Sequence, residues 1–393
     1  MFVATKDTPL ATTITGSLPR PHWFSENLNG RSFLTAFNGD ATYREQYSDA
    51  IGALIGDQCR AGLDLVTDGE MRFDNDIGGR SWFGYAFDRM EGLSSRERGV
   101  PNPGGQRRPD FVRRAENSGD IMSEFISTVR PPQVVGPIGP GTLQYDAVWK
   151  VAQRLTHKPV KVGSCCGQML DRYVIGGYYK DRLEQLFAFS AALNAEHHRL
   201  ADAGCAVIQL EEPCLHGSGG VMGEVSFDDY IDAFNREVAG LRDKTEVWCH
   251  TCWGNPFAQR LGQRPSYKPT LSYLGRLDVD VITIEAVENE GAEIADVASV
   301  LGNEKKLCIG VVNHRTLQIE LPEDIAALIR KALKSVPPER LLLSSDCGFG
   351  REGMSRTHAF YKMIAIVRGA NIVRRELGLP EAEIAASEPK YAL

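Results

Sequence analysis

Short apolar runs alternate with amphipathic helical patterns along most of this chain. Eight runs, most of them rich in β-branched residues and bounded by Gly, Asp or Pro, have the composition of buried strands. They are 12–15, 63–67, 159–162, 206–210, 245–249, 279–284, 307–312 and 341–344. Helical patterns occupy 43–61, 181–203, 227–241, 293–301, 322–334 and 357–377. This alternation predicts parallel βα units in an α/β fold, specifically a (β/α)8 TIM barrel.

The regular spacing breaks once, between the second and third runs. We expect residues 1–393 to form a single barrel domain, with 71–158 inserted as a long loop that covers the catalytic face as a lid. Part of this insertion, 95–109, is rich in Gly, Pro and Arg. That stretch is either a solvated lid surface or an anion clamp for a substrate carboxylate or sulfonate.

A doubly wound open sheet is the alternative architecture. It requires a glycine-rich phosphate-binding loop after the first strand. The segment that follows the first run here is Gly16-Ser17-Leu18-Pro19, which lacks that pattern. The barrel is therefore favoured.

Polar side chains and cysteines follow most of the predicted strands. In a barrel the carboxyl ends of the strands converge on one face, where the active site lies. His250 and Cys252 occupy positions i and i+2 at one strand end, so their side chains point the same way. The other candidates at strand ends are Ser17, Glu70, Glu211, Glu285, His314, Asp346 and Cys347.

Imidazole and thiolate groups are ligands that zinc prefers, and a catalytic zinc needs only three protein ligands and an open position. We predict a Zn²⁺ site made by His250 and Cys252, with Cys347 as the third ligand and Glu285 as the fourth. Taken alone, His250 is more typical of a hydrogen-bonded core histidine. The candidate ligands that follow several strands together favour a metal site over that interpretation. Four other cysteines lie in apolar contexts and are expected to pack in the core: Cys59, Cys205, Cys249 and Cys308.

The predicted site suits thiol chemistry. Zinc bound by thiolates is a Lewis acid that holds a substrate thiol as thiolate near neutral pH, aligned with an electrophilic carbon. Glu70 and Glu211 supply negative charge for an ammonium group, and backbone N–H groups near Ser17 suit a carboxylate. The predicted substrate is an amino acid that bears a thiol. His314 or Asp346 is the predicted acid for the leaving group.

Composition excludes several other partners. The net charge of −7 and the pI of about 5.7 provide no positive field for nucleic acid. No apolar run approaches the ~18 residues of a membrane helix, so no membrane partner is expected. Nine cysteines without secretory features indicate a reducing cytoplasm. We expect a cytoplasmic protein whose partners are a small thiol and an alkyl donor, and its oligomeric state stays unknown.

Six short motifs occur in order between residues 12 and 370. They are Gly16-Ser17-Leu18-Pro19, Asp68-Gly69-Glu70, Gln209-Leu210-Glu211-Glu212-Pro213, His250-Thr251-Cys252, Ile284-Glu285 and Asp346-Cys347-Gly348. This ordered set resembles the catalytic half of cobalamin-independent methionine synthase. The resemblance implies a (β/α)8 barrel that transfers a methyl group to homocysteine and gives methionine. The implied zinc ligands are His250, Cys252, Glu285 and Cys347, and the implied homocysteine-binding residues are Ser17, Glu70 and Glu211.

The chain departs from the family pattern at three places. His314 lies one position away from the family's proton-donating histidine. The segment 163–167, Gly-Ser-Cys-Cys-Gly, replaces the Thr-Gly-Pro that faces the methyl donor. Glu211 stands where the family usually has Asp, which resizes the amine pocket. The alkyl donor is therefore open: folate, methylcobalamin, an epoxide or another compound.

Short single-barrel relatives of the synthase provide the main alternative. One of them resembles epoxyalkane:coenzyme M transferase, in which zinc activates a sulfonated thiol. This resemblance implies an alternative function, the alkylation of coenzyme M or another small thiol. The Arg-rich stretch would then contact the sulfonate. A zinc-binding regulatory barrel without catalysis is a third hypothesis. A decarboxylase resembling the uroporphyrinogen enzymes is a fourth, and its chemistry needs no zinc.

Overall fold

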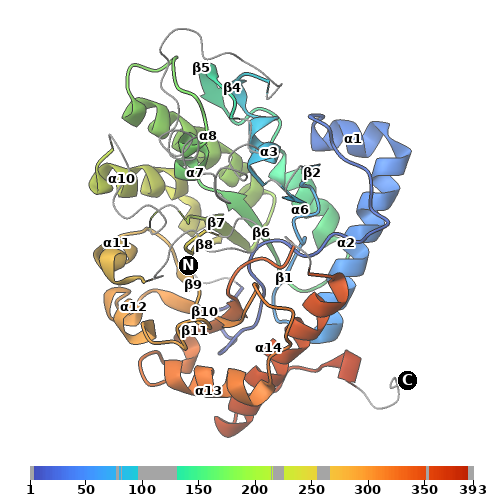
Figure 1. Cartoon of the computed structure of the whole chain (residues 1–393), viewed down its shortest axis with the longest axis vertical. Coiled ribbons are helices and arrows are strands. Elements are labelled where there is room, and N and C mark those ends of the chain that lie inside the picture. Colours follow the sequence, from blue (N-terminus) through green and yellow to red (C-terminus); the bar gives the residue numbers. More distant parts are fainter. Residues whose placement is uncertain are drawn as a thin grey trace, which may run out of the picture.

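A curled parallel sheet of seven strands forms the centre of the fold (Figure 1). The computed structural model describes residues 4–76, 79–80, 82–95, 131–213, 215, 225–254, 266–350 and 354–387. The strands lie in the sheet in the order in which they occur in the chain. Each crossover connection therefore adds the next strand at the same edge of the growing sheet. The strands are β1 (Val66–Thr67), β6 (Val160–Cys165), β7 (Val207–Glu211), β8 (Glu246–Thr251), β9 (Val281–Ile284), β10 (Lys306–Val312) and β11 (Leu341–Ser345).

The first predicted run bridges the two ends of this sheet. Thr12 pairs in parallel with Leu343 of β11, and the Thr13 N–H donates to the Leu343 carbonyl at 2.9 Å. On the other side, the Thr12 carbonyl accepts hydrogen bonds from the backbone N–H groups of Asp64 and Leu65, at 3.0 and 3.1 Å. These residues lead into β1. The segment around Thr12 therefore connects the first and last strands through backbone hydrogen bonds.

A small buried cluster, separate from the main core, lies along the strands. It takes one side chain from the Thr12 segment and one from each strand, or the residue beside it, except β6. Its members are Ala11, Leu65, Val207, Trp248, Val281, Cys308 and Leu342. On β6, Lys161 is also buried, and its Nζ lies 4.7 Å from the centre of the Trp248 ring. One strand therefore places a cation against this apolar cluster.

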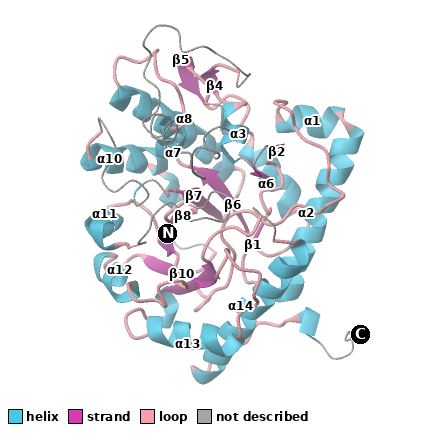
Figure 2. Ribbon diagram, in the orientation of Figure 1, coloured by secondary structure: helices cyan, strands magenta, loops and turns pink. Residues whose placement is uncertain are grey.

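Helices surround the sheet (Figure 2). The six predicted helical patterns correspond to α2 (Ala41–Ala61), α8 (Arg182–Asp202), α10 (Phe227–Val238), α12 (Ile294–Val300), α13 (Pro322–Ala332) and α14 (Arg356–Glu376). Asp40, Asp181, Ser226 and Ser355 cap four of them by accepting a hydrogen bond from a first-turn N–H. Shorter helices are α1 (Phe33–Gly39), α7 (Gly167–Arg172) and α11 (Leu271–Leu274).

The interval between β1 and β6 has structure of its own that the sequence patterns did not predict. Two antiparallel pairs form there, β2 (Asn75–Asp76) with β3 (Gly79–Arg80), and β4 (Glu91–Leu93) with β5 (Val134–Gly139). Helices α3 (Trp82–Phe87) and α6 (Tyr145–Gln153) complete it. The Arg-rich stretch from residue 96 onward lies outside the described residues.

Among the helices that the structure describes, none is both long enough and apolar enough to cross a membrane.

Candidate metal centre

Three predicted metal ligands meet at the carboxyl ends of two strands. His250 belongs to β8, Cys252 follows that strand, and Cys347 lies just beyond β11. The ligand atoms of the three side chains lie within 4.8 Å of one another. His250 and Cys252 are buried and Cys347 is partly exposed, so the group lies at the edge of the interior. The parallel sheet brings together residues that are far apart in the chain.

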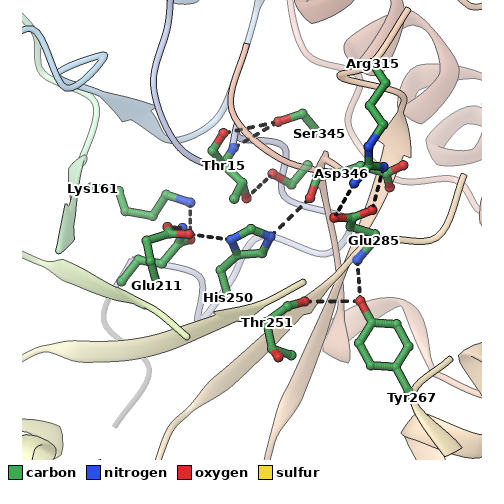
Figure 3. Close-up of polar contacts among 12 residues, drawn as sticks. Thr15, Lys161, Glu211, His250, Thr251, Tyr267, Glu285, Arg315, Ser345 and Asp346 are labelled. Carbon is green, nitrogen blue, oxygen red and sulfur yellow. Dashed lines mark hydrogen bonds and ion pairs between the residues drawn. The ribbon is translucent and has the colours of Figure 1, made fainter. Parts of the chain in front are cut away.

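Glu285, the predicted fourth ligand, lies close enough to His250, Cys252 and Cys347 to raise the pKa of each. It follows β9 and belongs to a second group with His314 and Asp346, whose ligand atoms also lie within 4.8 Å of one another. Arg315 donates to both Glu285 carboxylate oxygens, at 3.0 and 3.4 Å (Figure 3). In this structure a guanidinium therefore binds the fourth predicted ligand.

The orientation of His250 is set by a carboxylate. Its Nδ1 is hydrogen-bonded to Glu211 Oε2, and its Nε2 lies 3.1 Å from the backbone oxygen of Asp346 (Figure 3). Glu211 is the last residue of β7 and pairs in register with His250. A carboxylate behind a ligating imidazole fixes the ring and its tautomer in many metal sites. Because Glu211 holds Nδ1, Nε2 is the nitrogen that could coordinate a metal, in place of its contact with the Asp346 carbonyl.

Charge interactions shift the pKa values of the site residues. Burial opposes the charged form of His250, but the adjacent Glu211 carboxylate raises the pKa of His250 to about 9. The Cys252 hydrogen bond lowers the pKa of Cys347 to about 7, and His250 adds to this effect against the opposing effect of burial. The same sulfur–sulfur contact raises the pKa of Cys252. Of the two thiols, Cys347 is therefore the one that ionises more readily, and the protonated His250 ring favours its thiolate.

Two carboxylates face the same glycine beside this group. Glu70 has a left-handed backbone, with φ of 55°, and its N–H donates to Asp68 Oδ1 at 3.0 Å. A Cβ atom at Gly163 would lie 2.6 Å from Glu70 Oε1 and 3.8 Å from Glu211 Oε1. Because both oxygens approach one point of β6, they concentrate negative charge there.

Ser17 is buried against the loop that follows Cys347. Its carbonyl accepts a hydrogen bond from the Gly350 N–H at 2.8 Å. The backbones of Gly16 and Gly348 are also close, since a Cβ at Gly16 would lie 2.9 Å from the Gly348 Cα. Ser17 therefore lies next to the segment that carries Cys347.

Asp346 is fully buried between two loops. Its Oδ1 accepts hydrogen bonds from the N–H groups of Ala286 and Val287, at 2.8 and 3.2 Å. Burial, reinforced by the Glu285 carboxylate, raises the pKa of Asp346 well above its ordinary value. Asp346 belongs to the second group of ligand atoms, and its backbone oxygen, 3.1 Å from His250 Nε2, connects that group to the first.

Sequence reasoning missed two residues that shape this site. The Tyr267 hydroxyl donates to the Thr251 carbonyl at 3.1 Å and accepts from the Glu285 N–H at 2.9 Å, so it connects the ends of β8 and β9. No strand or helix pattern marks Tyr267 in the sequence. Arg315 follows the predicted strand 307–312. Because the other strand ends carry acidic residues, a cation at this strand end could have been predicted to form an ion pair in the site.

The fold and the site together define a class of protein. It is an α/β protein whose curled parallel sheet carries one imidazole and two thiols at the carboxyl ends of its strands. The family described as "Cobalamin-independent synthase, Catalytic domain" matches residues 111–370. The chain therefore belongs to the cobalamin-independent methionine synthase family, and the resemblance drawn from its motifs is confirmed.

Individual relatives cover almost the whole chain. A methionine synthase from Saccharolobus islandicus is 27% identical over 369 residues, which are 94% of this chain and 96% of that protein. The structure of a B12-independent methionine synthase from Shewanella sp. W3-18-1 aligns with a TM-score of 0.73 at 24% identity, over 94% of this chain and 99% of that one. A putative vitamin-B12 independent methionine synthase from Listeria monocytogenes aligns with a TM-score of 0.64 at 19% identity, over 92% and 96%. The two structures share the fold.

Proposed function

We propose that this protein is a zinc-dependent methyltransferase that methylates the thiol of homocysteine and gives methionine. The observation that carries the proposal is the meeting of His250, Cys252 and Cys347 within 4.8 Å at the carboxyl ends of the strands. Membership of the cobalamin-independent methionine synthase family, and relatives named methionine synthase, support the same activity.

The three side chains fit zinc. Two thiolates and one imidazole form a known catalytic zinc set, and bonds of about 2.0 to 2.3 Å place the ligand atoms of a tetrahedral ion roughly 3.5 Å apart. That spacing lies inside the observed limit of 4.8 Å. The Glu211 carboxylate on Nδ1 supplies the outer partner that a ligating histidine usually has. Glu285 is the fourth ligand in this proposal, exchanging Arg315 for the metal.

Bound zinc would supply a Lewis acid that keeps a substrate thiol ionised near neutral pH. The chain's own residues orient the rest of the substrate. Glu70 and Glu211, which both face Gly163, are placed to attract the ammonium group. Backbone N–H groups near Ser17 bind the carboxylate. With these groups held, the sulfur is positioned for in-line attack on the methyl carbon.

The leaving group of the methyl donor needs a proton. Asp346 is suited to provide it, because burial and the neighbouring Glu285 carboxylate raise the pKa of Asp346 and favour its protonated form. His314, in the same group as Asp346 and Glu285, is the other candidate acid. The methyl donor itself stays open.

We also propose that the sheet closes as a (β/α)8 barrel, with the Thr12 segment as its eighth strand. The hydrogen bonds of that segment to Leu343 on one side and to Leu65 on the other support closure. In this proposal residues 1–393 form one domain and 71–158 is an insertion that acts as a lid over the site; residues 96–130 of it lie outside the described residues.

Titration calorimetry of the zinc-loaded protein tests the function directly. Homocysteine should bind and release a proton, which is measured by repeating the titration in buffers of different ionisation enthalpy. Coenzyme M should not bind, because Glu70 and Glu211 repel its sulfonate. Coenzyme M binding in place of homocysteine would overturn the proposed substrate. Cys347→Ser should lose both zinc and methyl transfer, and full transfer by a metal-free protein would overturn the mechanism.

A further inference from the structure

A lysine is buried in the sheet below the metal centre. Lys161 of β6 is 1% exposed, and its Nζ donates to Gln209 Oε1 at 2.6 Å. The centre of the Trp248 ring lies 4.7 Å from the same atom. A buried ammonium group is costly unless carboxylates compensate it. The Glu211 and Glu70 carboxylates offset only part of this cost, because burial still lowers the pKa of Lys161.

Gln209 connects this lysine to the metal centre. Lys161 has only donors, so Gln209 must turn its carbonyl oxygen toward Lys161 and its amino group the other way. That amino group donates to Glu211 Oε1, and Glu211 Oε2 is hydrogen-bonded to His250 Nδ1. The four side chains come from three adjacent strands, β6, β7 and β8. Figure 3 labels three of them, Lys161, Glu211 and His250.

We propose that Lys161 is a positioning residue for the metal centre, acting through Gln209 and Glu211 to hold the His250 ring with its Nε2 toward the ion. The inference rests on the proposed function only in taking zinc as the metal. It assigns a role to a residue that no motif of the family resemblance contains.

Lys161 would act by fixing which groups donate and which accept in the hydrogen-bonded chain that leads to His250. Without Lys161, Gln209 Oε1 loses its donor, so only the bond to Glu211 holds the Gln209 side chain and its amide can swing away from that carboxylate. Glu211 then turns away and His250 Nδ1–H loses its acceptor. Burial lowers the pKa of Lys161 to about 8, so the side chain stays mostly charged, and a donor, at neutral pH.

Zinc affinity, measured by competition with a chromophoric chelator, tests this role. Lys161→Met should bind zinc about tenfold more weakly, the lower end of the effect of outer-shell partners of metal ligands. Lys306→Met is the matched control. Lys306 is a buried lysine on β10 that donates to the Thr5 carbonyl at 2.6 Å, outside the Gln209 chain. Its loss should leave zinc affinity unchanged.

A double-mutant cycle separates positioning from general damage. If Lys161 acts through Gln209, then adding Lys161→Met to Gln209→Leu should weaken zinc binding no further. Three outcomes would overturn the proposal. Lys161→Met could bind zinc as tightly as the wild type, or Lys306→Met could lose as much zinc affinity as Lys161→Met. The losses of zinc affinity in Lys161→Met and Gln209→Leu could also add fully in the double mutant. The absorption spectrum of the cobalt-substituted protein should change in Lys161→Met and stay unchanged in Lys306→Met.

A metal-free readout keeps this inference distinct from the proposed function. In ¹⁵N-histidine NMR spectra the His250 Nδ1–H proton, assigned by its loss in His250→Gln, should resonate far downfield because it donates to Glu211. Lys161→Met should move it upfield or broaden it away. If the wild type binds no zinc, the proposed function fails while this test still decides the role of Lys161. An unmoved signal would overturn that role even in a zinc enzyme.

Discussion

At the scale of single residues, Gly163 shows how little space the candidate substrate pocket has. The Glu70 and Glu211 carboxylates both approach it, and a Cβ there would lie 2.6 Å from Glu70 Oε1. Gly163→Ala should therefore fold normally, because the end of a flexible side chain can move. It should displace Glu70 and raise KM for homocysteine on the order of tenfold, with zinc content unchanged.

Steady-state kinetics with varied homocysteine measure this effect. Gly52→Ala is the matched control, because a Cβ at Gly52 in α2 would meet nothing within 4 Å. It should leave KM unchanged. A Gly163→Ala enzyme with wild-type KM would show that the amine is bound elsewhere.

Lys161 predicts a pH dependence of stability. Burial lowers its pKa from 10.5 to about 8 in the folded protein. Below pH 8 the lysine is charged in both states and folding bears the full cost of burying it. Between pH 8 and 10.5 the unfolded chain binds more protons than the folded one, so this contribution to the free energy of unfolding rises with pH.

Lys161→Met should remove that cost. It should be more stable than the wild type at pH 7, by about 3 kcal/mol at ~1.4 kcal/mol per pKa unit, and the difference should vanish by about pH 10.5. Denaturant unfolding of both proteins at several pH values measures it. A variant that is less stable at pH 7 would contradict the prediction.

At the scale of elements, Arg72 joins the interval after β1 to the sheet. It forms a fully buried ion pair with Asp68, at 2.9 Å, and donates to the Gly163 carbonyl of β6. The rings of Tyr85 in α3 and Tyr145 in α6 lie 5.5 and 5.2 Å from its guanidinium carbon. One side chain thus contacts two strand ends and two helices.

Arg72→Ala should lower the free energy of unfolding by about 3–5 kcal/mol, because it leaves the Asp68 carboxylate buried without its partner. The control is Arg236→Ala, which removes an exposed pair with Asp232 in α10 and should change stability by less than about 0.5 kcal/mol. Denaturant titration compares the two. Equal effects would mean that Arg72 is not the residue that joins these elements.

Elements were predictable where a long periodic pattern existed. The helices from α2 to α14 that follow such patterns, and strands β6 to β11, lie within a few residues of their predicted bounds. The pairs β2–β3 and β4–β5 were missed because their short strands carry too few residues for alternation to show. Residues 12–15 were predicted to form a strand. In the structure they form a single parallel bridge, from Thr12 to Leu343, and no extended strand.

At the scale of the whole molecule, the candidate metal centre connects distant parts of the chain. Its predicted ligands lie at the carboxyl ends of β8 and β11, so metal binding should stabilise the entire fold. Zinc at 100 times its Kd should raise the free energy of unfolding by about 2.7 kcal/mol, by mass action. The melting temperature should rise on adding zinc and fall again with a chelator.

Cys347→Ser should lose this response while remaining folded. Thermal unfolding monitored by circular dichroism, with and without zinc, measures both proteins. A zinc-induced stabilisation that survives in Cys347→Ser would place the metal at another group of ligands.

The sequence predicts those site residues whose positions depend only on which strand they follow. Parallel strands bring their carboxyl ends to one edge, so His250, Cys252 and Cys347 were expected to meet, and their ligand atoms do. Whether Glu285 joins them or pairs with Arg315 depends on loop geometry and on charge, which strand order does not encode. The chain from Lys161 to His250 depends on strand register, which the apolar pattern leaves open.

The separation of the ligands also has a consequence in time. Synthesis on the ribosome delivers His250 and Cys252 well before Cys347, and β9 and β10 must take their places between them. A nascent chain that has not yet released β11 offers only two of the three soft ligands. If the metal binds as proposed, its loading would follow the pairing of β11 with β10, and a bound ion would indicate that this last strand is in place.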